Sequence, residues 1–324
     1  MVSVIIATYN GEKYIAEQLR SVFLQTTPAD EVLIFDDCSS DGTVETVKIF
    51  IKENNCEHWS VAVNDRNKGY CKNFLEACKK ASGDIIFLCD QDDVWYSQKI
   101  EKMVSVMDSH AEISALCCSC ECIDGNGAKI PTPQNIGTVF DGDDGSIEYF
   151  TPERFVGRSF IRGCSVCFRK ELMRYIEPLE LKGLLSHDWL ITFTAALTKK
   201  CAVYNKVLMS YRCHGNNNSF GERQYGQRAL AKRIEALEYS IVGHTFILEN
   251  ADRYNNMTER IIKALKKNIS FEKLRISYLK NGGFKPLLSC LFSLYRYKCY
   301  YGSAKSAVKV FTGDILYRKK RKTP

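Results

Sequence analysis

The chain has 324 residues, of which 45% are hydrophobic and 26% are charged, a composition typical of a globular protein with a sizeable core. Its longest apolar stretch, residues 287–294, is too short to cross a bilayer, which excludes a membrane-spanning helix. Met1 leads directly into a strand-like segment without the regions of a secretion signal, so we expect a cytoplasmic protein.

Charge is distributed unevenly along the chain. Residues 222–324 hold 22 lysines and arginines against 8 acidic residues, whereas residues 1–221 hold 23 against 30. A basic segment of this kind contacts nucleic acid, anionic lipid or only water. No nucleic-acid recognition motif is present, so we expect no nucleic-acid partner.

The 15 cysteines are an odd number in a chain without an export signal, which favours free thiols over disulfides. Buried cysteine acting as a small hydrophobic residue is the preferred interpretation. A zinc site is the alternative, with ligands from Cys117, Cys118, Cys120, Cys122, Cys164 and Cys167.

The first half alternates strands and helices. Apolar runs predict buried strands at residues 2–7, 31–35, 60–64 and 85–89, and helices are predicted at 13–24, 43–52 and 73–80. Further strands are predicted at 114–123, 165–169 and 202–211, with a helix at 189–197 and a turn-rich stretch at 124–145. This pattern predicts an α/β fold with a Rossmann-like, mostly parallel sheet and helices on both faces.

Polar residues follow each of the first four predicted strands. Ligands bind at the carboxyl ends of the strands in open α/β sheets, so we expect one site built from four strand ends. The glycine-rich dinucleotide fingerprint and the P-loop sequence are both absent, which disfavours NAD enzymes and P-loop NTPases. The strand-end residues are Thr8, Tyr9 and Asn10; Asp36 and Asp37; Asn67, Lys68 and Gly69; and Asp90, Gln91, Asp92 and Asp93.

Three carboxylates end the strand at residues 85–89: Asp90, Asp92 and Asp93. Burying such a cluster is costly unless a cation or hydrogen-bond donors compensate. Oxygen ligands suit Mg²⁺ or Mn²⁺. A solvated acidic turn is the alternative.

Six short motifs carry a family resemblance. Val4-Ile-Ile-Ala-Thr-Tyr-Asn10, Asp36-Asp-Cys-Ser-Ser-Asp-Gly-Thr43 and Asp90-Gln-Asp-Asp-Val-Trp95 resemble the inverting family 2 glycosyltransferases, which have the GT-A fold. Asn67-Lys-Gly-Tyr-Cys-Lys-Asn-Phe74, Ser186-His187-Asp188-Trp189 and Tyr211-Arg212-x-His214-Gly215-Asn216-Asn217 resemble the bacterial rhamnosyltransferase branch of that family. The resemblance covers about residues 2–221.

The resemblance implies roles at the strand ends. Asp37 would accept a hydrogen bond from a uracil or thymine ring, and Asp90 would lie near the sugar and ribose. Asp92 would ligate a Mn²⁺ or Mg²⁺ ion that neutralises the departing nucleoside diphosphate. The donor-binding residues implied in this way are Thr8, Tyr9, Asn10, Glu12, Asp37, Lys68, Gly69, Asp90 and Gln91. For Lys68, a merely solvated loop lysine is the alternative.

Asp188 is the predicted general base. In an inverting transfer the acceptor hydroxyl must lose a proton as it attacks the anomeric carbon, and a positioned carboxylate suits that task. The alternative is structural, with Ser186 or Asp188 capping the helix at 189–197. Both roles are compatible.

The late loop after residue 211 is expected to complete the site. The resemblance implies His214 as a metal ligand; a phosphate contact from His214 or Arg212 is an alternative, as is a solvated histidine. Residues 214–226, with three glycines, would form a lid that excludes water. Residues expected at the acceptor pocket or the lid are Trp95, Arg162, Gly163, Trp189 and Arg212.

The C-terminal segment is expected to be helical, with apolar spacing at residues 228–250, 261–269 and 287–301. The last stretch interleaves aromatic and basic residues, which favours peripheral contact with an anionic membrane at the inner face. A helical subdomain with a solvated basic end is the equal alternative. We thus expect a GT-A domain at 1–221, with a donor half at 1–112 and an acceptor half at 113–221, and a basic extension at 222–324.

The sequence therefore predicts an inverting, metal-dependent glycosyltransferase. The first expectation for the donor is dTDP-rhamnose, with a UDP-hexose as the alternative, and the acceptor is a cell-surface polysaccharide or a lipid-linked glycan. A catalytically silent sugar-nucleotide-binding module and a nucleotidyltransferase are the rival hypotheses. The latter needs a basic glycine-rich loop after the first strand, and Thr8-Tyr-Asn-Gly-Glu12 lacks one.

Overall fold

The computed structural model describes residues 1–133, 140–157, 160–176, 186–214, 227–293 and 304–319. The chain divides into two compact units. The first comprises residues 1–151, 160–180 and 186–221, and the second comprises residues 152–159, 181–185 and 222–324. The functions predicted for 1–112, 113–221 and 222–324 stay predictions.

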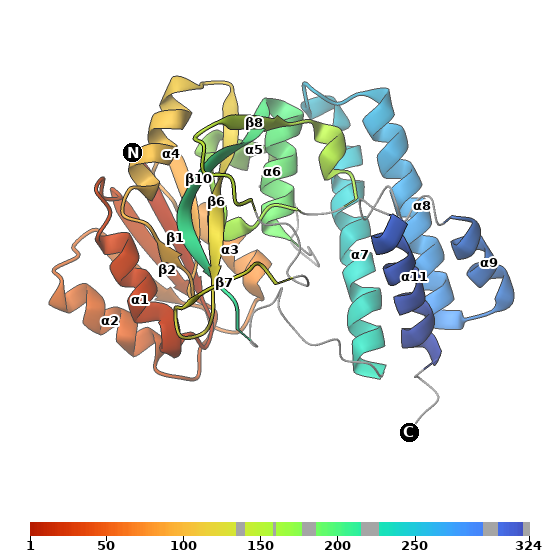
Figure 1. The fold of residues 1–324 in the computed structure, drawn as a ribbon, viewed down its shortest axis with the longest axis horizontal. Coiled ribbons are helices and arrows are strands. Elements are labelled where there is room, and N and C mark those ends of the chain that lie inside the picture. Colours follow the sequence, from red (N-terminus) through yellow and green to blue (C-terminus); the bar gives the residue numbers. More distant parts are fainter. Residues whose placement is uncertain (134–139, 158–159, 177–185, 215–226, 294–303, 320–324) are drawn as a thin grey trace. The chain divides into compact units, whose positions relative to one another are not determined.

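The first unit is built on a mixed, mostly parallel sheet in the order β3-β2-β1-β4-β9-β6-β10-β5 (Figure 1). β1 pairs in parallel with β2 and β4, and β2 with β3. β9 runs antiparallel to β4 and β6, and β10 is parallel to β6. The predicted α/β fold is confirmed. The strands are β1 (Val2–Thr8), β2 (Glu31–Asp36), β3 (Trp59–Val63), β4 (Ile85–Asp90), β5 (Val94–Trp95), β6 (Ile113–Ile123), β7 (Lys129–Ile130), β8 (Ile147–Phe150), β9 (Val166–Arg169) and β10 (Lys200–Arg212).

Helices cover both faces of this sheet, because the buried strands are apolar on both sides. The apolar side chains of α1, α2 and α4 share one core cluster with Val4, Ile6 and Phe87. Ile5 and Leu88 alternate to the opposite face, where α3 contacts β1 and α6. The helices are α1 (Glu12–Phe23), α2 (Thr43–Glu53), α3 (Tyr70–Cys78), α4 (Lys99–Ser109), α5 (Met173–Ile176) and α6 (His187–Thr198).

The sequence did not predict two short strands, β5 and β7, of which β5 holds the acidic turn after β4 in place. β5 follows the acidic turn and pairs antiparallel with Met209 and Ser210 of β10. β7 pairs with the end of β6. The turn at residues 91–93 is thus held between two strands of one sheet.

The cysteines of the described residues are free thiols, and all of them except Cys38 are buried. The preferred interpretation from the sequence agrees with this burial. Cys117, Cys118, Cys120 and Cys122 lie along β6. The zinc alternative gains no support, because the metal-ligand group found among the described residues consists of Asp90, Asp93 and Cys164.

The second unit is helical. Its helices are α7 (Gln227–Glu249), α8 (Glu259–Asn281), α9 (Phe284–Phe292) and α11 (Ala304–Lys319). α8, α9 and α11 pack around Phe271, Tyr278, Cys290 and Phe311, and α7 packs on Leu279 of α8 through Leu230 and Leu237. The sequence did not predict α11. Among the residues that the structure describes, no helix has the length and hydropathy that crossing a bilayer requires.

Candidate active site

The loops after β1 and β2 hold each other in place. Thr8 Oγ1 donates to Asp36 at 2.7 Å. Asn10 has a positive φ of 49°, and its amide oxygen accepts from the Ser40 N–H at 2.8 Å. Glu12 accepts from the N–H of Gly42 at 3.0 Å. Asn10 and Glu12 therefore shape this edge of the site.

Asp37 organises the loop after β3. Its two carboxylate oxygens accept from the backbone N–H groups of Lys68 and Gly69 at 2.7 and 2.8 Å. Gly69 has a φ of 84°, which favours glycine. Lys68 Nζ pairs with Glu76 at 2.9 Å. Because a carboxylate oxygen accepts more than one bond, Asp37 keeps capacity for a base.

Gln91 ties the acidic turn to the loop after β1. Its side-chain oxygen accepts from the Tyr9 N–H at 2.8 Å, and its amide nitrogen donates to the Tyr9 carbonyl at 3.1 Å. A Cβ on Gly11 would lie 2.2 Å from the Gln91 oxygen, so any larger residue there would displace the Gln91 side chain. The donor-binding residues predicted at the ends of β1 and β4 therefore lie together.

Asp90, which is half-buried, forms a cluster with the buried Asp93 and Cys164, with ligand atoms within 4.8 Å of one another. Asp93 is fully buried; its Oδ1 accepts from the Arg212 N–H at 2.9 Å, and its Oδ2 has no hydrogen-bond partner among the described residues. Burial and the charge of Asp92 raise the pKa of Asp93 to about 7. Burial, followed by the neighbouring carboxylates, holds the pKa of Asp90 well above its ordinary value. An excess of buried negative charge of this kind suits a bound cation.

Lys99 is a buried ammonium beside this cluster, and the sequence did not single it out. Its Nζ donates to the Cys164 carbonyl at 2.8 Å and lies 4.0 Å above the ring centroid of Trp95. It makes no ion pair in the part of the chain that the structure describes. Trp95 is 3% exposed. The predicted role of Trp95 at the acceptor therefore stays a prediction, whereas its contact with Lys99 is structural.

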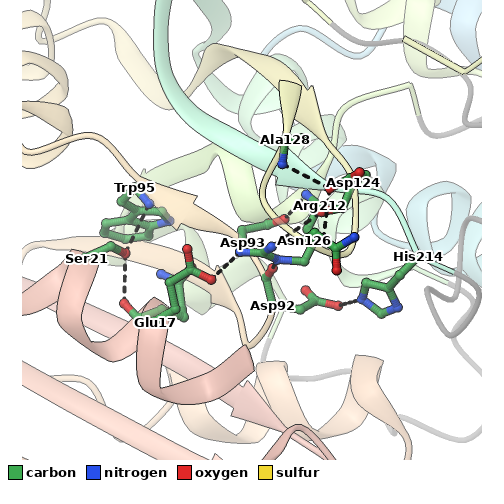
Figure 2. Close-up of polar contacts among 11 residues, drawn as sticks. Glu17, Ser21, Asp92, Asp93, Trp95, Asp124, Asn126, Ala128, Arg212 and His214 are labelled. Carbon is green, nitrogen blue, oxygen red and sulfur yellow. Dashed lines mark hydrogen bonds and ion pairs between the residues drawn. The ribbon is translucent and has the colours of Figure 1, made fainter. Parts of the chain in front are cut away.

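Asp92 and His214 meet on the other side of the turn (Figure 2). Asp92 Oδ2 lies 2.8 Å from Nε2 of His214. The two side chains are 15% and 14% exposed. The ring of Tyr14 lies 4.9 Å from that of His214. A carboxylate and an imidazole are ligands that Mn²⁺ accepts, so these residues fit the predicted metal site.

Arg212 is a buried side chain that contacts the backbone of Asp92. The guanidinium is 1% exposed; Nε donates to the Asp92 carbonyl at 2.7 Å and Nη2 pairs with Glu17 at 2.5 Å (Figure 2). It also lies 4.8 Å above the ring of Tyr14. Arg212 therefore links α1, the acidic turn and the end of β10 that carries His214.

Asp188 lies in the first turn of α6. Ser186 is the N-cap and its hydroxyl accepts from the Trp189 N–H at 3.2 Å. Oδ1 of Asp188 accepts from the same N–H at 2.6 Å and from the Ser186 hydroxyl. Oδ2 makes no hydrogen bond with the described residues. The charge of Asp188 contributes to the raised pKa of Asp90, so the two carboxyl groups are neighbours.

His187 is a motif residue to which the sequence assigned no role. It is 5% exposed and stacks on Phe74 at 4.3 Å, and neither ring nitrogen has a hydrogen-bond partner among the described residues. Burial lowers the pKa of His187, although the charge of Asp188 opposes this. A Cβ on Gly163 would lie 2.9 Å from its Nε2. Because Gly163 has no side chain, His187 of α6 can pack closely against it.

Arg162 and Trp189, two other residues predicted at the acceptor pocket, make packing contacts within the fold. Arg162 stacks on the ring of Tyr211 at 4.2 Å, and Trp189 is 7% exposed and packs on Phe193. The lid predicted at 214–226 lies outside the described residues after His214. Lys99, Glu17 and Tyr14 lie in no motif, and His187 lies in the motif Ser186–Trp189 but was assigned no role from the sequence. Their burial or pairing comes from distant segments, so no local signal pointed to them.

Carboxylates gathered at the ends of parallel strands in a GT-A-like sheet define a nucleotide-sugar glycosyltransferase. The model of glycosyl transferase family 2 matches residues 3–174. That is more than half of the chain, and the chain belongs to this family.

Two named relatives match in sequence. The poly(ribitol-phosphate) β-N-acetylglucosaminyltransferase TarS of Staphylococcus aureus is 34% identical over 110 residues, which are 33% of this chain and 19% of TarS. The UDP-Glc:α-D-GlcNAc-diphosphoundecaprenol β-1,3-glucosyltransferase WfgD of Escherichia coli is 33% identical over 138 residues, 42% of this chain and 53% of WfgD. The matches thus span about half of WfgD and about a fifth of TarS.

Two solved structures share the fold. TarS residues 1–349 in complex with UDP superimpose with a TM-score of 0.59 at 21% identity, covering 98% of this chain and 91% of that one. The mannosyltransferase PcManGT of Pyrobaculum calidifontis, solved with GDP-Man and Mn²⁺, has a TM-score of 0.56 at 17% identity, covering 99% and 88%.

Proposed function

We propose that the chain transfers glucose or N-acetylglucosamine from a UDP donor to a hydroxyl group of a polymer or lipid-linked glycan, with inversion at the anomeric carbon. The names of WfgD and TarS support this donor class, because one acts with UDP-Glc and the other is an N-acetylglucosaminyltransferase. TarS was also solved with UDP. The earlier expectation of dTDP-rhamnose has no such support among the named relatives and becomes the second choice.

The observation that carries the proposal is the pairing of Asp92 with His214 at the edge where the strand ends converge. A Mn²⁺ or Mg²⁺ ion bound there would supply the positive charge that stabilises the departing nucleoside diphosphate. The Mn²⁺ in the PcManGT structure supports a metal in this fold. Arg212 is then a positioning residue, since it fixes the backbone at Asp92 relative to His214.

Asp188 is the general base of this proposal. Its Oδ1 is held by the Trp189 N–H, which leaves Oδ2 to accept the proton of the acceptor hydroxyl. A side chain held at the start of a helix is aimed with little freedom, which favours a productive geometry. The proton moves to Asp188 as the hydroxyl oxygen forms its bond to the anomeric carbon and the bond from that carbon to the diphosphate oxygen breaks.

The remaining roles follow the same division of the chain. Asp37 receives the base through its spare acceptor capacity, and Asp90 lies toward the sugar. Arg162, Gly163 and Trp189 shape the acceptor side. We assign donor binding to residues 1–112, acceptor binding to 113–221 and no catalytic role to 222–324.

Asp92→Ala tests the metal site. Titration calorimetry with UDP-glucose and Mn²⁺, with and without EDTA, should show metal-dependent binding in the wild type and none in the variant, because a ligand has been removed. Asp84→Ala is the matched control: it removes a carboxylate just before β4, with its side chain 85% exposed. Donor affinity that responds to EDTA equally in wild type and Asp92→Ala would overturn the metal role.

The donor itself is identified by thermal stability. UDP-glucose, UDP-N-acetylglucosamine and dTDP-rhamnose are compared with Mn²⁺ present. A donor at about 100 times its Kd raises the free energy of unfolding by about 2.7 kcal/mol. Stabilisation by dTDP-rhamnose alone would reverse the choice of donor.

A further inference from the structure

The short helix α9 is apolar on two sides. Its inner side contributes Cys290, which is fully buried, and Leu287, which packs on the core around Phe271. On its outer side Phe284 and Phe292 are 73% and 77% exposed. The inner contacts explain why the helix packs on its own unit, but they do not explain why apolar side chains are exposed on its outer side.

The outer residues form a continuous stripe. Phe284, Leu288, Leu291 and Phe292 recur at spacings of four, three and one residues, which place them on one face of a helix. Leu291 is 42% exposed and Leu288 is half-buried. Single exposed hydrophobic residues are ordinary, whereas two exposed phenylalanines and two leucines on one face of a nine-residue helix mark an interaction surface.

The backbone before α9 sets its direction. Gly282 and Gly283 both have positive φ, at 71° and 94°, a conformation that favours glycine. They end α8 and start α9 in a new direction, and Figure 1 shows α9 at the outer edge of the helical unit. The helix has nine residues, too few to span a bilayer, so it suits a position in the plane of a membrane surface.

The net positive charge of this part of the chain favours anionic lipid as the occupant. Residues 222–324 hold 22 basic against 8 acidic residues. Lys285 adjoins Phe284 and is exposed, as are Lys266 and Lys273 on α8, and these three make no ion pair with the described residues. A second protein would need a matching acidic surface, whereas anionic lipid offers negative charge and an apolar interior together.

We propose that α9 is a membrane-contact helix that inserts Phe284, Leu288, Leu291 and Phe292 at the boundary between headgroups and acyl chains of an anionic membrane. Lys285, which adjoins Phe284, contacts the phosphates of the headgroups. The proposal goes beyond the transfer reaction and does not depend on the identity of the sugar. It assigns the contact to α9 and not to the basic residues at the end of the chain.

Vesicle flotation of the full chain tests the contact. The wild type should bind vesicles of phosphatidylglycerol and phosphatidylcholine more tightly than vesicles of phosphatidylcholine alone. The double variant Phe284→Ser with Phe292→Ser should bind roughly 100-fold more weakly, since each buried phenylalanine contributes a large apolar area. The matched control is Leu24→Ser with Ile49→Ser, on side chains that are 55% and 46% exposed in the first unit, and it should bind like the wild type.

Phe292→Trp supplies a direct readout that preserves an aromatic side chain. The native tryptophans Trp59, Trp95 and Trp189 are at most 7% exposed, so they give a constant background. With anionic vesicles the new tryptophan should shift its emission to the blue and be quenched by brominated lipid chains. Unchanged emission, vesicle binding that high salt removes completely, or equal binding by the double serine variant each overturn the proposal. Donor binding, measured with UDP-glucose in the same samples, separates this outcome from failure of the transfer proposal.

Discussion

Two clusters of buried ionisable side chains differ in how their charges are balanced. In the helical unit Asp314 accepts from Arg275 at 2.9 Å and from Arg233 at 2.5 Å, and Glu272 pairs with His244 at 3.2 Å. Each of these charged groups has a partner of opposite charge or a hydrogen-bond partner. This cluster joins α7, α8 and α11.

The cluster at the end of β4 is unbalanced. Asp93 leaves one oxygen without a partner, both ring nitrogens of His187 lack one among the described residues, and Lys99 has no ion pair there. Unsatisfied buried groups cost about 1–3 kcal/mol each. The difference teaches that the paired cluster is complete within the fold, whereas the cluster at the end of β4 keeps polar atoms that a ligand can bind.

The largest expected effect is on Asp188. Asp188→Asn keeps an oxygen to accept from the Trp189 N–H but cannot take the acceptor proton, so the transfer rate should fall by a factor of about 10² to 10⁴. The dissociation constant of the donor should stay unchanged. Both are measured in a steady-state transfer assay and by calorimetry.

Ser186→Ala is its matched control. It removes the N-cap hydroxyl and should cost about 1 kcal/mol of stability with the base retained. Near-normal transfer by Asp188→Asn would leave Asp188 a capping residue only.

A substitution in the paired cluster of the helical unit should lower the free energy of unfolding. Asp314→Asn leaves two guanidinium groups without their carboxylate and should cost about 3–5 kcal/mol. Burial acts to raise the Asp314 pKa, but Arg275 and Arg233 outweigh it and hold the pKa below its ordinary value. A depressed pKa stabilises the fold above the unfolded value of about 3.9, and this stabilisation is lost as the pH falls through the folded value.

Denaturation followed by helical circular dichroism, at neutral and acid pH, checks both statements. The wild type should lose stability on acidification, and Asp314→Asn should lose less. Tryptophan fluorescence reports the first unit, which contains Trp59, Trp95 and Trp189. An Asp314→Asn protein as stable as the wild type would show that the pairing contributes nothing.

The smallest effect concerns the two buried histidines. His187→Phe replaces two unpartnered nitrogens with a ring of similar shape on Phe74 and should raise the free energy of unfolding by about 1 kcal/mol while lowering transfer. His244→Phe removes a partner of Glu272 and should destabilise by about 1–3 kcal/mol without that loss of transfer. Thermal denaturation and the transfer assay decide. If both variants changed the free energy of unfolding in the same direction, the distinction between the two clusters would be lost.

The sequence predicted the fold wherever local pattern carried the information. Strands β1, β2 and β4 are continuous apolar runs, and their polar ends lie together as expected. It did not predict β5, which has two residues and exists only because β10 pairs with it. It also gave no role to Lys99 or to His187, although His187 stands in a quoted motif. Their character comes from burial by distant segments, which a linear pattern does not contain.

The position of β5 has a consequence for binding. The three residues 91–93 connect two strands that are both paired within one sheet, so their backbone is already ordered before a ligand arrives. Fixing a free loop costs about 1–2 kcal/mol per residue in conformational entropy. Here folding has met that cost, so little of the donor's binding free energy is spent on ordering the acidic turn.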